Sequence, residues 1–138
     1  VVVIGGGLAG TESACDIAAR ADHVTLLEMM PDILYTAQHC LNNDQHLRRL
    51  VKDRNVETIG NAKVIAISNN SVTYEKDGQT YVIACDTIIN AVGFRPNNEL
   101  EDLLEDIYED VCVVGDAVSP RKIMTAIHEG YHAIRVME

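Results

Sequence analysis

The first 30 residues change from apolar to glycine-rich to amphipathic segments in an order that predicts strand, turn, helix and strand. Four β-branched residues, Val1 to Ile4, predict a buried strand that runs directly into glycines. Thr11 to Arg20 carries Ala14 and Ile17 at helical spacing, which predicts a helix with one packing face. His23 to Leu27 predicts a second strand, so the chain opens on a β-α-β pattern.

Helical periodicity returns after a segment of mixed character. Asp32 to Leu41 is interpreted as a loop or a short helix, and Asn42 and Asn43 as N-caps of a helix from Asp44 to Arg54. Val56 to Ile59 predicts a third strand. The basic residues of this second helix are assigned mostly to its solvated outer face: Arg48, Arg49, Lys52 and Arg54.

The pattern then becomes that of an antiparallel sheet. Lys63 to Ile67, Val72 to Glu75 and Thr80 to Ala84 predict three short strands, separated by Asn69-Asn70 and by Asp77-Gly78, a strong hairpin signal. The predicted fold class is therefore α/β: a Rossmann-like parallel sheet with helices on both faces, and a three-stranded antiparallel meander.

The last third of the chain predicts four more elements. Asp86 to Ala91 is a buried-type strand that ends at Val92-Gly93. Glu99 to Asp110 predicts a short amphipathic segment with an acidic face, and Val111 to Val114 a buried strand that precedes Gly115-Asp116. A closing helix from about Lys122 to Val136 is expected to bury its apolar residues: Ile123, Ala126, Ile127, Ala133 and Ile134.

Composition limits the classes of partner. The formal net charge of -10 argues against binding to nucleic acid or to anionic membrane surfaces. The apolar runs are too short to span a bilayer and no signal peptide is visible, although a chain that opens on a buried strand suggests a piece of something longer. The scattered cysteines suggest core residues in a reducing, cytoplasmic setting: Cys15, Cys40, Cys85 and Cys112.

The glycines after the first strand carry the chemical prediction. Gly5, Gly7 and Gly10 have the G-x-G-x-x-G spacing that permits a tight turn, a close approach of a pyrophosphate and close helix packing. The pyrophosphate would meet the free amides and positive dipole end of the following helix. Glu28 lies 18 residues after Gly10, where an acid holds a ribose diol. Because Met29 and the residues after it offer no cation for a 2′-phosphate, NAD is favoured over NADP.

These segments together resemble the NAD-binding module of the pyridine-nucleotide oxidoreductase superfamily of flavoprotein reductases. The resemblance is closest to the C-terminal part of the group of 2-enoate reductase, 2,4-dienoyl-CoA reductase and NADH:flavin oxidoreductase. It is carried by VVVIGGGLAGTESA at the start, Glu28, INAVGFRPN at Ile89 to Asn97, and VVGDAVSPRKIMTAIHEGYHAIR at Val113 to Arg135.

The resemblance implies an enzyme in which NADH passes hydride to FAD, and electrons then reach a barrel that reduces an activated C=C bond. It divides the chain into an NAD(H)-binding Rossmann unit at 1–92 and a segment similar to the C-terminal part of an FAD domain at 93–138. It implies that flavin and barrel domains of the same parent chain are partners, and that the surface meeting them can form a homo-oligomer. No catalytic residue and no metal ligand are assigned.

Position by position, the resemblance implies a set of cofactor-binding residues. Glu12 is similar to the acid near the nicotinamide, Gly93 to a glycine on that side, and Asp116 to the acid that bonds the ribityl chain of FAD. The whole set is Gly5, Gly7, Leu8, Ala9, Gly10, Glu12, Glu28, Met29, Val92, Gly93, Gly115 and Asp116. Where the family has Ala-Thr-Gly this sequence has Ala91-Val92-Gly93, and a first FAD half, a barrel and cluster cysteines are absent from it.

Three other hypotheses stay open. His128-Glu129-Gly130-Tyr131-His132 matches the H-E-x-x-H pattern of zinc proteases, although little sequence follows to supply a third ligand. The Gly loop and Glu28 can also hold FAD. The chain can lastly be a dinucleotide-binding module that catalyses nothing alone.

Overall fold

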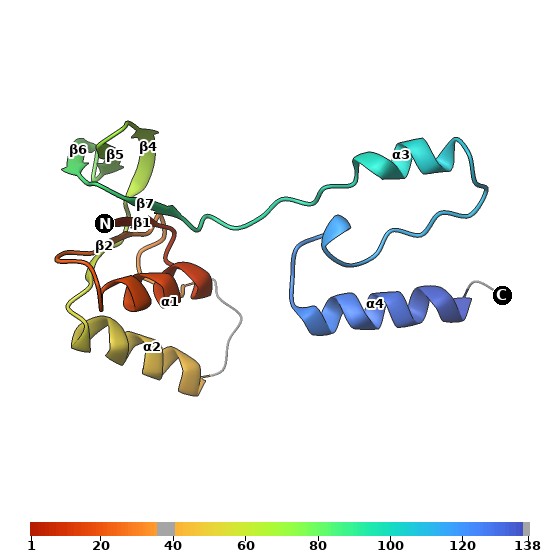
Figure 1. Cartoon of the computed structure of the whole chain (residues 1–138), viewed down its shortest axis with the longest axis horizontal. Coiled ribbons are helices and arrows are strands. Elements are labelled where there is room, and N and C mark those ends of the chain that lie inside the picture. The colour runs from red at the N-terminus through yellow and green to blue at the C-terminus, as the bar shows by residue number, and fades with distance from the viewer. Residues whose placement is uncertain (36–40, 137–138) are drawn as a thin grey trace. The chain divides into compact units, whose positions relative to one another are not determined.

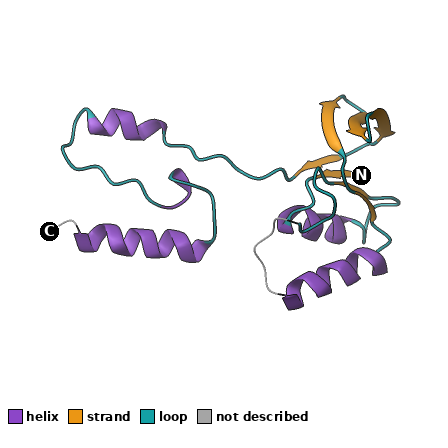
Figure 2. Ribbon diagram, turned by 180° about the vertical axis from the view of Figure 1, so that it is seen from behind, coloured by secondary structure: helices purple, strands orange, loops and turns teal. Residues whose placement is uncertain are grey.

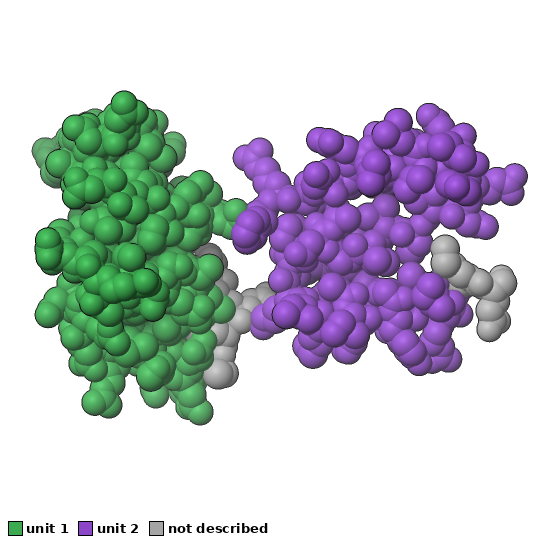
Figure 3. Space-filling view, viewed as in Figure 1, with its two compact units in different colours: residues 1–93 green, residues 94–138 purple. Residues whose placement is uncertain are grey.

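The computed structural model describes residues 1–35 and 41–136. The chain forms two compact units, Val1–Gly93 and Phe94–Glu138, which Figure 3 colours separately. Each unit has its own set of elements and is described by itself.

The first unit is built on a four-stranded parallel sheet. Its strands are β1 (Val2–Ile4), β2 (Thr25–Leu27), β3 (Glu57–Ile59) and β7 (Ile88–Asn90), in the order β3-β2-β1-β7. All three strand pairs are parallel. β1 and β2 are buried along their whole length, which explains why their sequences are continuous apolar runs rather than alternating ones.

Two helices cover one face of this sheet (Figures 1 and 2). They are α1 (Leu8–Ile17) and α2 (Leu41–Asp53). The sheet residues Val3 and Leu26, each 0% exposed, belong to one core cluster with Ala14 of α1 and with Leu47 and Val51 of α2. This burial, rather than helix propensity alone, holds the two short helices in place.

The antiparallel meander covers the other face. It consists of β4 (Lys63–Ile67), β5 (Ser71–Lys76) and β6 (Gln79–Ala84), paired in the order β4-β5-β6. Because side chains alternate along a strand, Val2 and Leu27 point away from the helices and pack with Val72 and Tyr74 of β5. The α/β class and the meander are confirmed. The difference from the prediction is that, in this unit, the meander takes the place of helices on the second face.

Helix boundaries differ from the sequence prediction. α1 begins at Leu8, before Thr11, because the extended Gly7 is already its N-cap. Glu12 therefore lies beyond the first turn of α1, not within it. α2 begins at Leu41, so Asn42 and Asn43 lie inside the helix rather than capping it. Cys40 and the rest of residues 36–40 lie outside the described residues.

The second unit consists of α3 (Glu99–Glu105), a short 3₁₀ turn at Gly115–Ala117 and α4 (Ile123–Val136) (Figure 1). The strand predicted for Val111 to Val114 was wrong: Val114 is extended, but no strand occurs among the described residues of this unit, and a strand needs a hydrogen-bonded neighbour.

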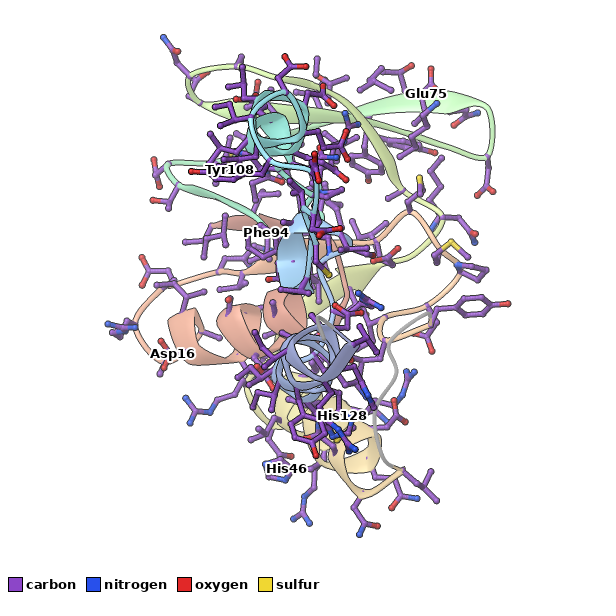
Figure 4. The ribbon with its side chains drawn as sticks, turned by 90° about the vertical axis from the view of Figure 1, so that its right-hand side faces the viewer. Asp16, His46, Glu75, Phe94, Tyr108 and His128 are labelled. Carbon is purple, nitrogen blue, oxygen red and sulfur yellow. The ribbon has the colours of Figure 1, made fainter. Side chains whose placement is uncertain are left out.

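The closing helix also differs from prediction in its burial. Ile123, Ile127 and Ile134 were expected inside, but they are 81%, 63% and 73% exposed. Two helices and an extended segment supply too little surface to cover them. Figure 4 shows α4 end-on with His128 labelled, which is likewise exposed.

None of the helices described is both long enough and apolar enough to cross a membrane.

Candidate dinucleotide site

The glycine loop follows the carboxyl end of β1 and is packed against the end of β7. Gly5 has a φ of +102°, a left-handed conformation that side chains rarely adopt. A Cβ at Gly5 would overlap the carbonyl group of Ala91, and a Cβ at Gly10 would overlap the carbonyl oxygen of Gly5. Both glycines are therefore required by close backbone approaches, and Gly10 lets α1 start tightly against the strand end.

Gly7 differs from these two glycines. No heavy atom of the described residues lies within 4 Å of the place a Cβ would occupy, and its φ of -69° would suit any residue. Beside it, the first amides of α1, including those of Leu8 and Ala9, have no intrahelical acceptor, and no side chain in the described part of the chain caps the helix. Thr11 is the residue whose amide donates back to the Gly7 carbonyl, at 2.9 Å. Open space thus meets free backbone donors, an arrangement that suits a diphosphate.

Glu28 follows the carboxyl end of β2, the neighbouring strand. Its Oε2 accepts the amide of Gly6 at 2.5 Å, and its Oε1 accepts the amide of Met30 at 2.7 Å. A carboxylate has about four acceptor sites, so two remain for further donors such as the two hydroxyls of a ribose. The half-buried carboxylate is fixed beside the glycine loop, while Met29 is 63% exposed.

Sequence reasoning missed the role of Gly6. Both backbone polar groups of this buried glycine are hydrogen-bonded. Its amide donates to Glu28, and its carbonyl oxygen accepts from the amide of Leu34 at 2.7 Å and from the hydroxyl of Thr11 at 3.2 Å. A Cβ there would press on Glu28 and on Ile33 at 3.0–3.1 Å. The available signal was that a glycine also stands between Gly5 and Gly7, at a position where the G-x-G-x-x-G pattern does not require one.

Arg48 of α2 is the exception to the predicted solvated basic face, because Arg49, Lys52 and Arg54 are exposed as expected. Its guanidinium donates to Asp44, to Asp32 and to the carbonyl oxygen of Ile33. Burial lowers the pKa of this guanidinium, but its hydrogen bonds with Asp44 and Asp32 outweigh that effect and leave the pKa above its ordinary value. The acids at positions 32 and 44 were the signal, because Asp44 lies one helical turn before Arg48.

The remaining predicted residues of the first unit lie at the end of β7 and on α1. The amide of Ala91 donates to the Ile4 carbonyl at 2.8 Å, which places the end of β7 beside β1. Val92 is 66% exposed, Gly93 has a φ of +89°, and Glu12 is exposed on α1. Since parallel strands end at the same edge of the sheet, the segments after β1, β2 and β7 meet there, at the usual ligand crevice of open α/β sheets.

The second unit holds Gly115 and Asp116 in its 3₁₀ turn. The amide of Gly115 donates to Oε2 of Glu129 at 2.8 Å, and the other Glu129 oxygen pairs with Arg121. Asp116 is exposed and accepts the Arg121 amide at 3.4 Å. Glu129, the acid of the H-E-x-x-H pattern, thus braces the turn that carries Asp116. Nothing in the described parts of the chain brings three metal-ligating side chains together.

Comparison with known proteins gives one family. The family model of the pyridine nucleotide-disulphide oxidoreductases matches residues 1–130. A bilirubin reductase from Mediterraneibacter gnavus is 36% identical over 138 residues, covering 99% of this chain and 21% of that protein. An NADH oxidase from Thermoanaerobacter brockii is 33% identical over 132 residues, covering 95% and 20%.

A solved structure also matches the chain over nearly its whole length. A 2-naphthoyl-CoA reductase in complex with 2-naphthoyl-CoA matches with a TM-score of 0.81 and 27% identity, over 99% of this chain and 21% of that one. The chain therefore spans about one fifth of the length of the proteins it matches.

Proposed function

The chain belongs to the pyridine nucleotide-disulphide oxidoreductase family, and from that premise we propose that its first unit binds NADH for hydride delivery to FAD in a larger flavin oxidoreductase. The family and the NADH oxidase relative point to NAD(H) and FAD as the cofactors. The family supports oxidoreductase activity for the larger protein. The preference for NADH and the route through FAD are the proposal.

The observation that carries the proposal is the fixed place of Glu28 beside the open side of the glycine loop. Gly7 leaves room for a diphosphate, and the first amides of α1 would donate to it. Glu28 has acceptor sites left for the adenosine ribose hydroxyls. A 2′-phosphate would instead meet this carboxylate, while Arg48 is already engaged by Asp32 and Asp44. The site therefore favours NADH.

The other residues take roles that follow from where they lie. Glu12, Val92 and Gly93 would flank the nicotinamide, which supplies the hydride when the cofactor is bound. In the second unit, Asp116 would hold the ribityl chain of FAD on a turn that Glu129 braces through Gly115. The exposed apolar residues of α4 would be covered by the remaining flavin domain of the parent protein.

For the parent protein we propose reduction of an activated C=C bond, in an enoate or dienoyl type of substrate. The resemblance in sequence supports this, as does the match to a 2-naphthoyl-CoA reductase. The 138-residue chain alone is expected to bind NADH and to catalyse nothing.

The absorbance spectrum of the purified chain, followed by titration with NADH, tests the proposal against its main rival. A colourless protein that binds one NADH supports it. A yellow protein with one FAD per chain and no affinity for NADH would instead assign the glycine loop to FAD.

A further inference from the structure

One arginine of α2 binds three acceptors at once. Nη1 of Arg48 donates to Oδ2 of Asp32 at 2.6 Å, and Nη2 donates to the carbonyl oxygen of Ile33 at 2.8 Å. Nε donates to the Asp44 carboxylate at 3.0 and 3.1 Å. Asp44 anchors the guanidinium to its own helix, so the other two nitrogens tie α2 to the segment that follows β2.

That segment is held in an unusual conformation. Leu34 has a φ of 60°, the left-handed region that a residue with a side chain adopts only when its surroundings hold it there. Leu34 is 3% exposed and Ile33 is 5% exposed, and both belong to the core cluster that contains Leu47 and Val51 of α2. The bonds from Arg48 add a polar restraint to this packing immediately before Leu34.

The restraint reaches the candidate site through Gly6. The amide of Leu34 donates to the Gly6 carbonyl oxygen at 2.7 Å, and the amide of Gly6 donates to Glu28 at 2.5 Å. Gly6 therefore lies between Leu34 and the carboxylate of Glu28. A shift of Leu34 would break its hydrogen bond to the Gly6 carbonyl oxygen. The distance between the glycine loop and Glu28 would then no longer be fixed.

We propose that Arg48 is a positioning residue for the dinucleotide site, which holds Asp32 and Ile33 so that Leu34 and Glu28 both stay on Gly6. The inference rests on the proposed function, because it concerns how tightly the same site binds NADH. Arg48 itself would touch no part of the nucleotide.

The chemistry of the side chain explains why an arginine is needed. Each of the three acceptors is bound by a different nitrogen of the planar guanidinium, whose N–H groups point in different directions. A lysine has one compact ammonium group, which cannot bridge all three positions. Two carboxylates also neutralise the charge of Arg48, so its role is geometric rather than the attraction of a phosphate.

The test measures NADH affinity by calorimetry and the exchange rate of the Leu34 amide by NMR in the 138-residue chain. Arg48→Gln is expected to weaken NADH binding roughly tenfold and to speed exchange of the Leu34 amide. Arg48→Lys should recover only part of the affinity. The matched control is Arg49→Gln on the same helix, because Arg49 is 82% exposed and pairs only weakly with Asp53 at 3.5 Å; it should behave as wild type.

A folded Arg48→Gln variant with wild-type NADH affinity would overturn the inference, even if its melting temperature fell. If that variant does not fold, Asp32→Asn decides, because Asp32 lies at the surface: affinity reduced about threefold supports the inference, and unchanged affinity with unchanged Leu34 exchange overturns it. A wild-type chain that binds no NADH would refute the proposed function itself, which separates the two failures.

Discussion

The amide nitrogen of Gly6 lies 2.5 Å from Oε2 of Glu28, so the acid at the end of β2 is bonded directly to the loop at the end of β1. The two residues are 22 positions apart in the sequence. Their bond joins the part of the site proposed for the diphosphate to the part proposed for the ribose. Several predictions about binding depend on this one contact.

Replacing Glu28 tests the ribose contact. Glu28→Gln keeps the shape of the side chain but loses the charge, and Glu28→Arg adds a cation. Both should weaken NADH binding, by about 1–3 kcal/mol for the loss of a charged acceptor. Calorimetry gives the dissociation constants, with Glu75→Gln on the exposed side of β5 as control (Figure 4). Unchanged affinity in both Glu28 variants would reject the contact.

Two alanine substitutions should separate folding from binding. Gly10→Ala places a Cβ on the Gly5 carbonyl oxygen, and this overpacking should destabilise the fold by about 1–3 kcal/mol. The Cβ of Gly7→Ala would have none of the atoms that the structure describes within 4 Å, and the substitution needs no unusual backbone, so its stability should match wild type. Its methyl group would stand at the loop that the diphosphate is proposed to approach, and NADH binding should weaken.

Urea unfolding and NADH titration on both variants check this pair. The result that contradicts the account is a Gly7→Ala protein with full NADH affinity, because then no ligand approaches that glycine closely.

Stability should fall at alkaline pH in part through Cys15. Burial raises the pKa of this thiol above its ordinary value of 9.0, with Arg54 opposing and Glu12 adding to the rise. The folded state thus keeps the proton longer than the unfolded state does. The resulting stability is fully present below the unfolded pKa and is lost as pH rises through the folded pKa.

Urea unfolding at about pH 8 and about pH 10 measures that loss. The decrease should be smaller in Cys15→Ala than in wild type, whereas Cys112→Ala, at an exposed cysteine, should show the wild-type decrease. Equal decreases in all three proteins would show that Cys15 does not contribute.

Glu129 should matter to the second unit and not to the first. Glu129→Gln weakens the bonds to Gly115 and Arg121, so exchange of the Gly115 amide should become faster. NADH affinity should stay at the wild-type value. Amide exchange followed by NMR checks both statements, with Glu109→Gln as the exposed control. An unaltered Gly115 amide would show that Glu129 does not hold the turn in solution.

The sequence was sufficient for the parts of the fold that local pattern determines. The buried runs of β1 and β2, the Asp77-Gly78 hairpin and the order of elements in the first unit could be predicted, because each depends on residues close in the sequence. The glycine spacing likewise indicated where the backbone must approach itself. Glu28 was proposed from its distance from Gly10, a spacing that the βαβ unit imposes, and the structure places it beside the glycine loop.

Contacts between residues far apart in the chain could not be predicted from the sequence. Arg48 looks like one more basic residue of a solvated helix until Asp32 is brought beside it, 16 positions away in the sequence. Val111 to Val114 has the composition of a strand, yet a strand forms only where another strand lies alongside. The apolar face of α4 was expected inside for the same reason: periodicity indicates which side of a helix is apolar but not whether anything covers it.

Calorimetric titration of the 138-residue chain with NADH and with NADPH is the sharpest test of the ribose contact assigned to Glu28. NADH is expected to bind with a dissociation constant in the micromolar range or weaker, and NADPH more weakly still, since its 2′-phosphate would meet Glu28. NADPH binding as tight as NADH, or tighter, would contradict the assignment of Glu28 to the adenosine ribose.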